Sequence, residues 1–237
     1  MTKTITVEIW SDFICPWCWI GKRRFERALA DFPHRDQVEV IHRAFRLMPG
    51  QSPRPVDDVL GQRVGAAQAA AIRAQTESEA ATEGLTYHLA GTLAGDTLDG
   101  HRLMKLATAH GLQERAIERL YRAYFSEQES LFDRDTLLRL GTEIGLDRDA
   151  CAAVLENTDH MATVEDDQRR VQSHGGSGVP FFLIERQLAV SGAQAAVVFR
   201  SALEQAWNSH QADTQEATAG VSCGPEDCSF PPESTSR

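Results

Sequence analysis

The chain has 237 residues, of which 42% are hydrophobic, so it can bury a sizeable core in one large domain or two small ones. Its formal net charge of −10, from 24 basic and 34 acidic residues, makes nucleic-acid backbones and anionic membrane surfaces poor partners. A strand pattern starts within a few residues of Met1 and no apolar run approaches about eighteen residues, so we expect a cytosolic protein without a signal peptide or a membrane span.

The N-terminal part of the chain predicts a strand, a helix and a second strand. Alternating apolar residues from Thr4 to Trp10 predict the first strand, and helical spacing predicts a helix over residues 19–32 that stops near Pro33. Residues 37–47 then return to strand composition. This order, over about forty residues, is typical of a βαβ unit.

The tetrad Cys15-Pro16-Trp17-Cys18 lies between the first strand and the helix. At a helix N-terminus the first sulfur lies among unpaired backbone N–H groups and at the positive end of the helix dipole, which favours its thiolate. Pro16 suits the first helical turn because its missing N–H would have no partner there. We therefore interpret Cys15 as the attacking thiolate and Cys18 as the resolving thiol. Such a pair can also be half of a zinc site, but the strand–motif–helix context favours redox chemistry.

From residue 57 to about residue 175, every segment with a clear pattern is helical. The longest predicted helix covers residues 57–83, is rich in Ala and Gln, and ends at Gly84. Further helices are predicted over residues 99–111 and around residues 117–124, 137–144 and 148–156. We interpret residues 51–174 as an all-helical insertion.

Strand composition resumes at residues 179–184 and 187–190, which the turn-like pair Glu185-Arg186 joins into a hairpin. Residues 194–207 predict a last amphipathic helix, and residues 211–237 a polar C-terminal tail. Pro180, at the first position of a strand, removes a ladder donor. It is either an ordinary edge-strand proline or the second residue of a cis Val179–Pro180 bond, which would expose the Val179 backbone to an extended substrate.

The remaining cysteines lie outside the tetrad. Five cysteines in a reducing compartment indicate catalytic, redox-sensing or metal-binding use rather than a structural disulfide framework. Cys151 shares an apolar helical face with Val154 and Leu155, so we expect it to be buried and inert. Cys223 and Cys228 flank a segment with glycine and proline that allows a disulfide. Three interpretations of this second pair stay open: a redox shuttle that exchanges with the first pair, a metal site, or two exposed tail cysteines.

Several runs, spread over residues 3–207, form a recognisable set: Ser11–Cys18, Arg43–Leu47, Gly100–Leu103, Gly178–Phe182 and Ser191–Gln194. Together they resemble the DsbA family of thiol-disulfide oxidoreductases, in particular its FrnE-type branch. The resemblance implies an α/β protein with a thioredoxin-like fold at residues 1–50 and 175–210, interrupted by the helical domain at residues 51–174. It also implies a catalytic disulfide between Cys15 and Cys18, a cis-proline at Pro180, and substrate binding by Pro16, Trp17, Val179 and Pro180.

Two residues depart from the pattern of this family. Thioredoxin-like proteins usually carry a buried carboxylate six positions before the nucleophile, and that position is Ile9 here. Glu8, one residue away, is open to two interpretations: a proton carrier for Cys18, or a solvent-facing strand glutamate. Trp17 stands where many oxidising relatives have histidine, so the cation that lowers the thiolate pKa is missing.

The patterns together predict a cytosolic thiol-disulfide oxidoreductase or disulfide isomerase that acts on protein thiols and disulfides. It would need no organic cofactor and no metal, with glutathione or a thioredoxin-type reductant as redox partner. One alternative is a redox sensor that binds one zinc through Cys15, Cys18, Cys223 and Cys228. Another is a small-molecule oxidoreductase or isomerase similar to kappa-class transferases, although those enzymes carry serine where Cys15 stands.

Overall fold

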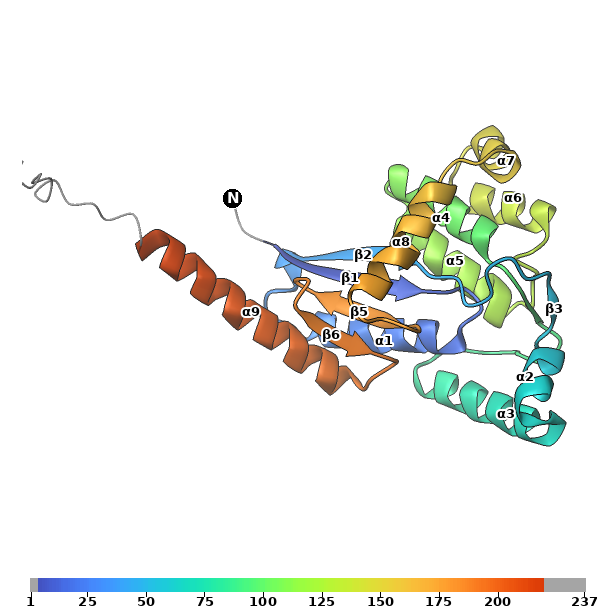
Figure 1. Ribbon diagram of the computed structural model, residues 1–237, viewed down its shortest axis with the longest axis horizontal. Helices are drawn as coiled ribbons and strands as arrows, with labels where there is room; N and C mark the ends of the chain where they lie inside the picture. Colours follow the sequence, from blue (N-terminus) through green and yellow to red (C-terminus); the bar gives the residue numbers. More distant parts are fainter. Residues whose placement is uncertain (1–3, 220–237) are drawn as a thin grey trace, which may run out of the picture.

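The computed structural model of the chain describes residues 4–219 (Figure 1). Its strands are β1 (Ile5–Ser11), β2 (Val38–Ala44), β3 (Arg54–Pro55), β4 (Leu93–Ala94), β5 (Phe181–Ile184) and β6 (Leu188–Ser191). Its helices are α1 (Pro16–Ala30), α2 (Val56–Val64), α3 (Ala66–Thr82), α4 (Leu98–Ala109), α5 (Gln113–Phe125), α6 (Arg134–Glu143), α7 (Arg148–Glu156), α8 (Met161–Ser173) and α9 (Ala196–Ala219), with a short 3-10 turn at Arg35–Gln37.

A four-stranded sheet forms the centre of the molecule, in the order β2-β1-β5-β6. β1 pairs in parallel with β2, so the first three elements form the predicted βαβ unit. β5 pairs antiparallel with both β1 and β6, and the last two strands form the predicted hairpin. The sheet therefore joins the two ends of the sequence and brings residue 179 to the end of β1 that precedes the cysteine motif.

Helices cover both faces of this sheet (Figure 1). Because side chains alternate along a strand, Ile5, Val7 and Ile9 of β1 point to one face, where they pack with Phe25 of α1 and Phe199 of α9. The opposite face carries Trp10, which packs with Phe181 and with Val171 of α8. These apolar residues are almost completely buried, so both layers are held by the hydrophobic effect.

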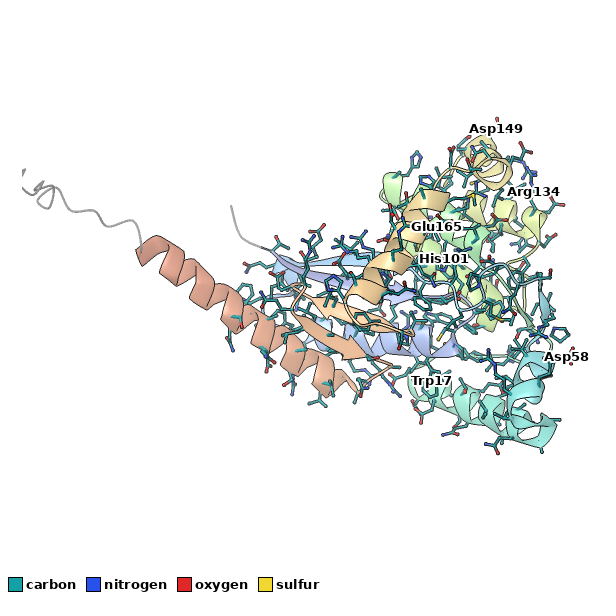
Figure 2. All side chains as sticks on the ribbon, viewed as in Figure 1. Trp17, Asp58, His101, Arg134, Asp149 and Glu165 are labelled. Carbon is teal, nitrogen blue, oxygen red and sulfur yellow. The ribbon has the colours of Figure 1, made fainter. Side chains whose placement is uncertain are left out.

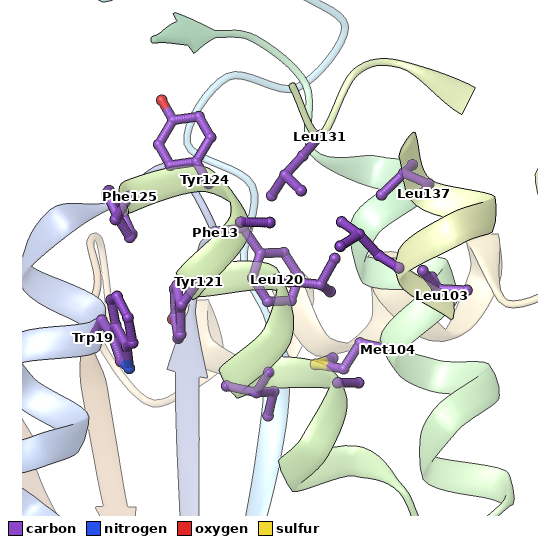
Figure 3. Close-up of a cluster of buried hydrophobic side chains, with 14 of the residues drawn as sticks. Phe13, Trp19, Leu103, Met104, Leu120, Tyr121, Tyr124, Phe125, Leu131 and Leu137 are labelled. Carbon is purple, nitrogen blue, oxygen red and sulfur yellow. The ribbon is translucent and has the colours of Figure 1, made fainter. Parts of the chain in front are cut away.

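The helical insertion packs its own core directly against the start of α1. Figure 3 shows Tyr121 and Phe125 of α5 beside Trp19 of α1. Phe13 lies between this aromatic group and the leucines of α4, α5 and α6. Trp19 is stacked on Tyr121 with ring centroids 5.7 Å apart. The same buried cluster includes Cys15 and Cys18, so the cysteine motif belongs to the core that joins the two parts of the chain.

Lys22 forms a second link between α1 and the insertion. Only 3% of its side chain is exposed, and its ammonium group contacts the carboxylates of Glu26, Glu114 and Glu118, the last at 2.7 Å. Burial alone would raise the pKa of Glu114, but a hydrogen bond to His42 and the charge of Lys22 outweigh it and lower this pKa to about 2. The Glu114 carboxylate therefore stays charged beside the buried cation.

The insertion departs from the prediction in two places. The single helix expected over residues 57–83 is wrong, because Gly65 adopts a φ of +85° and separates α2 from α3. The all-helical interpretation of residues 51–174 is wrong in detail, since β3 and β4 pair antiparallel beside α2. Tyr124 donates a hydrogen bond of 2.7 Å to the carbonyl of Leu93 and fixes β4 against α5.

The last helix is longer than its apolar pattern. α9 continues to Ala219, well into residues 211–237, which we expected to be a polar tail. In Figure 1 its C-terminal part extends beyond the sheet. Throughout residues 4–219, no helix combines the length and the apolar character needed to cross a bilayer.

Candidate active site

The cysteine motif begins where β1 ends and α1 starts. Cys15 is the N-cap of α1, with φ −87° and ψ 108°, and Pro16 occupies the first helical turn. The Cys18 amide donates a hydrogen bond of 3.0 Å to the Cys15 carbonyl, so both cysteines belong to this first turn. No acidic side chain lies in the first turn of α1, so no residue of the helix itself compensates the positive end of its dipole at Cys15.

The loop before β5 meets the first thiol. The Cys15 thiol donates to the Val179 carbonyl at 3.6 Å, although the two residues are 164 positions apart. The Val179–Pro180 peptide bond is cis, as the resemblance implied. Cys15, Val179 and Pro180 therefore lie together, whereas Trp17 points toward the α2–α3 pair (Figure 2).

Both thiols are free, and they differ in their surroundings. Both residues are buried, and Cys15, which is 6% exposed, is more accessible than Cys18, which is 2% exposed. Burial raises the pKa of the Cys18 thiol well above its usual value, and a hydrogen bond to Cys15 and the charge of Cys15 raise it further. Cys18 therefore holds its proton at neutral pH.

Asp12 anchors the turn before Cys15, a role that sequence reasoning missed. Its side chain is fully buried, and its carboxylate accepts hydrogen bonds of 2.7 Å from the Thr97 hydroxyl and 2.7 Å from the Leu47 amide. Its carbonyl accepts from the Cys15 amide at 3.1 Å. An aspartate three positions before a helix-opening cysteine is a turn signal that could have identified it.

Glu8 lies on the face of the sheet opposite to α1. Its side chain is 2% exposed and is paired with Arg43 at 2.7 Å and with Arg170 of α8 at 3.0 Å. The interpretation as a solvent-facing glutamate is therefore wrong. Its neighbour Ile9 points toward α1, so Glu8 points away from the helix that carries Cys18.

An apolar cavity of about 300 Å³ lies beside the motif. Residues 14–17 form one wall and Leu47 and Met48 a second. Side chains of α2, α3, the segment before β4, β4 itself and the end of α5 form the rest. Tyr87 supports the first wall, because its hydroxyl donates a hydrogen bond of 2.9 Å to the Pro16 carbonyl. Its walls come from segments far apart in the chain, and most of them belong to the helical insertion, which the small-molecule alternative expects to form a pocket over Cys15.

The other predicted cysteines fall in two classes. Cys151 is fully buried, as expected, and burial raises the pKa of its thiol. Cys223 and Cys228 lie outside the described residues. The three interpretations of this pair, as a redox shuttle, a metal site or exposed tail cysteines, therefore remain predictions from the sequence.

Comparisons with known proteins point to one family. Residues 6–204 match the family described as DSBA-like thioredoxin domain. The crystal structure of a probable DsbA oxidoreductase, SCO1869 from Streptomyces coelicolor, shares 40% identity and a TM-score of 0.83, covering 96% of this chain and 100% of that one. YwbO of Bacillus subtilis strain 168, described as uncharacterized, is 28% identical over 207 residues, 84% of this chain and 96% of YwbO.

A more distant match shares the fold. The cytosolic disulfide reductase DsbM from Pseudomonas aeruginosa, solved with GSH, has 21% identity and a TM-score of 0.58, and the match covers 86% of this chain and 99% of that one. The predicted thioredoxin-like fold with a helical insertion is thereby confirmed.

Proposed function

Because the chain belongs to the family of DSBA-like thioredoxin domains, we propose that it is a cytosolic thiol-disulfide oxidoreductase that exchanges disulfides with protein substrates through Cys15 and Cys18. The observation that carries the proposal is the position of the Cys15 sulfur, at the N-terminus of α1 and 3.6 Å from the Val179 carbonyl. There the sulfur lies at the positive end of the helix dipole and beside a backbone that can pair with an extended substrate.

The exchange proceeds in two steps that balance. The Cys15 thiolate attacks one sulfur of a substrate disulfide, so a mixed disulfide forms and the other substrate sulfur leaves as a thiolate that takes a proton. Cys18 then loses its proton and attacks the Cys15 sulfur, which releases the second substrate thiol. The substrate gains two electrons and two protons, and the Cys15–Cys18 dithiol, which supplies them, is oxidised to a disulfide. The reverse sequence oxidises a dithiol substrate.

Single substitutions test these roles. We expect Cys15→Ser to abolish insulin reduction and refolding of a scrambled protein, because the attacking sulfur is lost. Cys18→Ser should accumulate mixed disulfides at Cys15, since no second thiol resolves them. Mass spectrometry detects the adducts. Equal loss of activity in both variants with no adduct in Cys18→Ser would contradict the assignment.

The redox partner and the direction are also part of the proposal. The two cysteines carry the electrons themselves, so no organic cofactor is required. Glutathione or a thioredoxin-type reductant would reset the pair, in line with the glutathione present in the DsbM structure. A redox titration of Cys15 and Cys18 against glutathione gives the reduction potential, and this potential decides between oxidation and reduction.

The zinc-sensor alternative makes a different prediction. It requires Cys223 and Cys228 to join Cys15 and Cys18 around one ion, with all four sulfurs as thiolates. Metal analysis of the full chain, purified with and without a chelator, distinguishes the sensor from the enzyme. The sensor is favoured if each chain binds one zinc ion and if the chelator removes both this ion and part of the protein's stability.

A further inference from the structure

The hydroxyl of Tyr121 is a buried group without a hydrogen-bond partner. The residue is 1% exposed, and no atom of residues 4–219 stands at hydrogen-bond geometry to its phenol oxygen. Tyr124, on the same helix α5, has the ordinary arrangement, because its hydroxyl donates a hydrogen bond of 2.7 Å to the Leu93 carbonyl. An unpartnered buried hydroxyl costs stability, so its presence calls for a functional explanation.

Aromatic neighbours fix the ring of Tyr121 in place. It stacks on Trp19 with ring centroids 5.7 Å apart and meets Phe13 edge-on at 5.4 Å. Trp19 directly follows Cys18 in α1, and Figure 3 shows its ring beside that of Tyr121. Both rings belong to the buried cluster that includes Cys15 and Cys18. The hydroxyl is therefore held in the core next to the cysteine motif.

The charge of Cys18 acts on this hydroxyl. Burial raises the pKa of Tyr121 well above its usual value, and the charge of Cys18 is the next cause, ahead of the charge of Cys15. The Ser11 hydroxyl acts in the opposite sense, without reaching hydrogen-bond geometry. Tyr121 therefore keeps its proton at neutral pH, so toward a negative charge on Cys18 it is a hydrogen-bond donor and not a base.

The resolving step needs such a donor. Cys18 is 2% exposed, and burial is the largest of the causes that raise the pKa of its thiol. To attack Cys15, this thiol must become a thiolate in surroundings that offer it little water. A hydrogen bond with the Asp12 backbone favours the thiolate, whereas the charge of the Asp12 carboxylate disfavours it. A second donor lowers the free energy of forming the thiolate, because a fixed dipole is most effective where water is excluded.

We infer that the Tyr121 hydroxyl donates a hydrogen bond to the Cys18 thiolate during the resolving step, which makes Tyr121 a catalytic residue of the second exchange. The inference rests on the proposed function. Cys18 releases its proton to water, its thiolate attacks the Cys15 sulfur, and the bond between Cys15 and the substrate sulfur breaks. The substrate leaves as a thiolate that takes up a proton, and Tyr121 ends with the proton it started with.

The lifetime of a mixed disulfide tests this role. Reduced full-length protein is mixed with glutathione disulfide, and acid-quenched mass spectrometry follows the glutathione adduct at Cys15 and its conversion to the Cys15–Cys18 disulfide. We expect Tyr121→Phe to form the adduct at the natural rate and to convert it about threefold more slowly at neutral pH. Loss of the hydrogen bond lowers the thiolate fraction of Cys18 about tenfold, and the more basic thiolate regains about threefold as a nucleophile.

Two further measurements separate catalysis from packing. Carbon NMR of labelled cysteine in a Cys15→Ser background titrates Cys18, and Tyr121→Phe should raise its pKa. The free energy of unfolding of the reduced protein should not fall in Tyr121→Phe, because the deleted hydroxyl has no partner. Tyr124→Phe is the matched control on the same helix. It loses the hydrogen bond to Leu93, so its stability should fall, while both rate constants and the pKa of Cys18 stay those of the natural protein.

Each outcome has a distinct meaning. An unchanged conversion rate and an unchanged pKa of Cys18 in Tyr121→Phe would overturn the inference and leave the proposed function intact. If Tyr121→Phe slows both steps and lowers the stability, the ring only packs against the motif, and the inference is also overturned. If neither the adduct at Cys15 nor the Cys15–Cys18 disulfide forms in the natural protein, the proposed function is contradicted, and the inference with it.

Discussion

At the scale of single residues, the burial of Cys18 makes protein stability depend on pH. Its pKa is raised well above the usual value, chiefly by burial, so the folded protein keeps a proton that the unfolded chain loses near pH 8.5. The unfolded state then binds fewer protons than the folded state, and the free energy of unfolding falls as pH rises above about 8.5.

This pH dependence can be isolated by substitution. We expect the free energy of unfolding of the reduced protein to fall more steeply between about pH 8.5 and 10 than that of Cys18→Ala, since the variant lacks the thiol. Urea denaturation followed by circular dichroism measures both. Parallel pH profiles would show that Cys18 is not the group responsible.

Glu8 gives a second test at this scale. Its carboxylate is buried between Arg43 and Arg170, so Glu8→Ala leaves Arg170 without the carboxylate it contacts and Arg43 with Asp167 alone, 3.4 Å away. We expect a loss of about 3 kcal/mol in the free energy of unfolding. Glu39→Ala on β2 is the control, because Glu39 is exposed, and we expect a change within about 0.5 kcal/mol. If Glu8→Ala instead slows disulfide exchange tenfold without a loss of stability, Glu8 acts as a proton carrier for Cys18.

The position of the two cysteines at a helix N-terminus could be predicted from the sequence, and the residues that surround them could not. Spacing and the strand before the motif were enough for Cys15 and Cys18, because a helix N-terminus acts on a thiol locally. The contacts of Glu8 and Asp12 depend on partners from α8, from the N-cap of α4 and from the loop after β2. Such partners are set by the packing of the sheet, and no local pattern contains them.

At the scale of elements, α1 lies unusually close to the loop that carries Pro180. A Cβ added at Gly21 would lie 3.0 Å from Cγ of Pro180 and 3.3 Å from Cα of Ala193. We expect Gly21→Ala to push this loop away from α1, to slow mixed-disulfide formation several-fold, and to reduce stability by about 1–3 kcal/mol. Stopped-flow exchange and urea denaturation measure the two effects.

Gly61 provides the matched control for this substitution. It lies inside α2, and an added Cβ would have no atom within 4 Å. Gly61→Ala should therefore stabilise the protein by about 0.5–1 kcal/mol, the usual gain for alanine over glycine in a helix. If the rate of mixed-disulfide formation is unchanged in both variants, the loop at Pro180 can move away from α1 without affecting the reaction at Cys15.

Most elements follow their sequence patterns, and the exceptions have physical causes. Strand alternation and helical spacing identified β1, α1, the closing hairpin and the helices from α4 to α7. Gly65 could not be distinguished from a tolerated helical glycine, because both flanking segments are good helix formers and only the observed φ of +85° reveals the break. β3 and β4 span two residues each, too few for periodicity to appear.

At the scale of the whole molecule, Lys22 joins the two parts of the chain through charge. The carboxylate oxygens of Glu26, Glu114 and Glu118 lie within 4.8 Å of one another, so without the ammonium group they repel. We expect Lys22→Met to lower the free energy of unfolding by about 3 kcal/mol at pH 7. The pKa of Glu114 is lowered to about 2, so this stabilisation is present above about pH 4.3 and is lost as pH falls toward 2.

The pH dependence provides the check on this cluster. Urea denaturation of Lys22→Met and of the natural protein at pH 7 and near pH 2 should give a large difference in stability at pH 7 and a small one in acid. Arg200→Met is the control, since Arg200 lies on α9 in a solvent-exposed pair with Glu204. A difference that is the same at both pH values would mean that packing, and not charge, is lost.

The exposure of Trp17 has an optical consequence. It is the most exposed of the four indoles, because Trp10 and Trp19 are buried and Trp207 is half-buried. Its emission should shift to shorter wavelength when a peptide bonded to Cys15 covers the indole. In Cys18→Ser trapped with a peptide substrate the spectrum should therefore move, whereas a Trp17→Phe background should leave it in place. The chain thus carries its own fluorescent reporter of what is bound to Cys15.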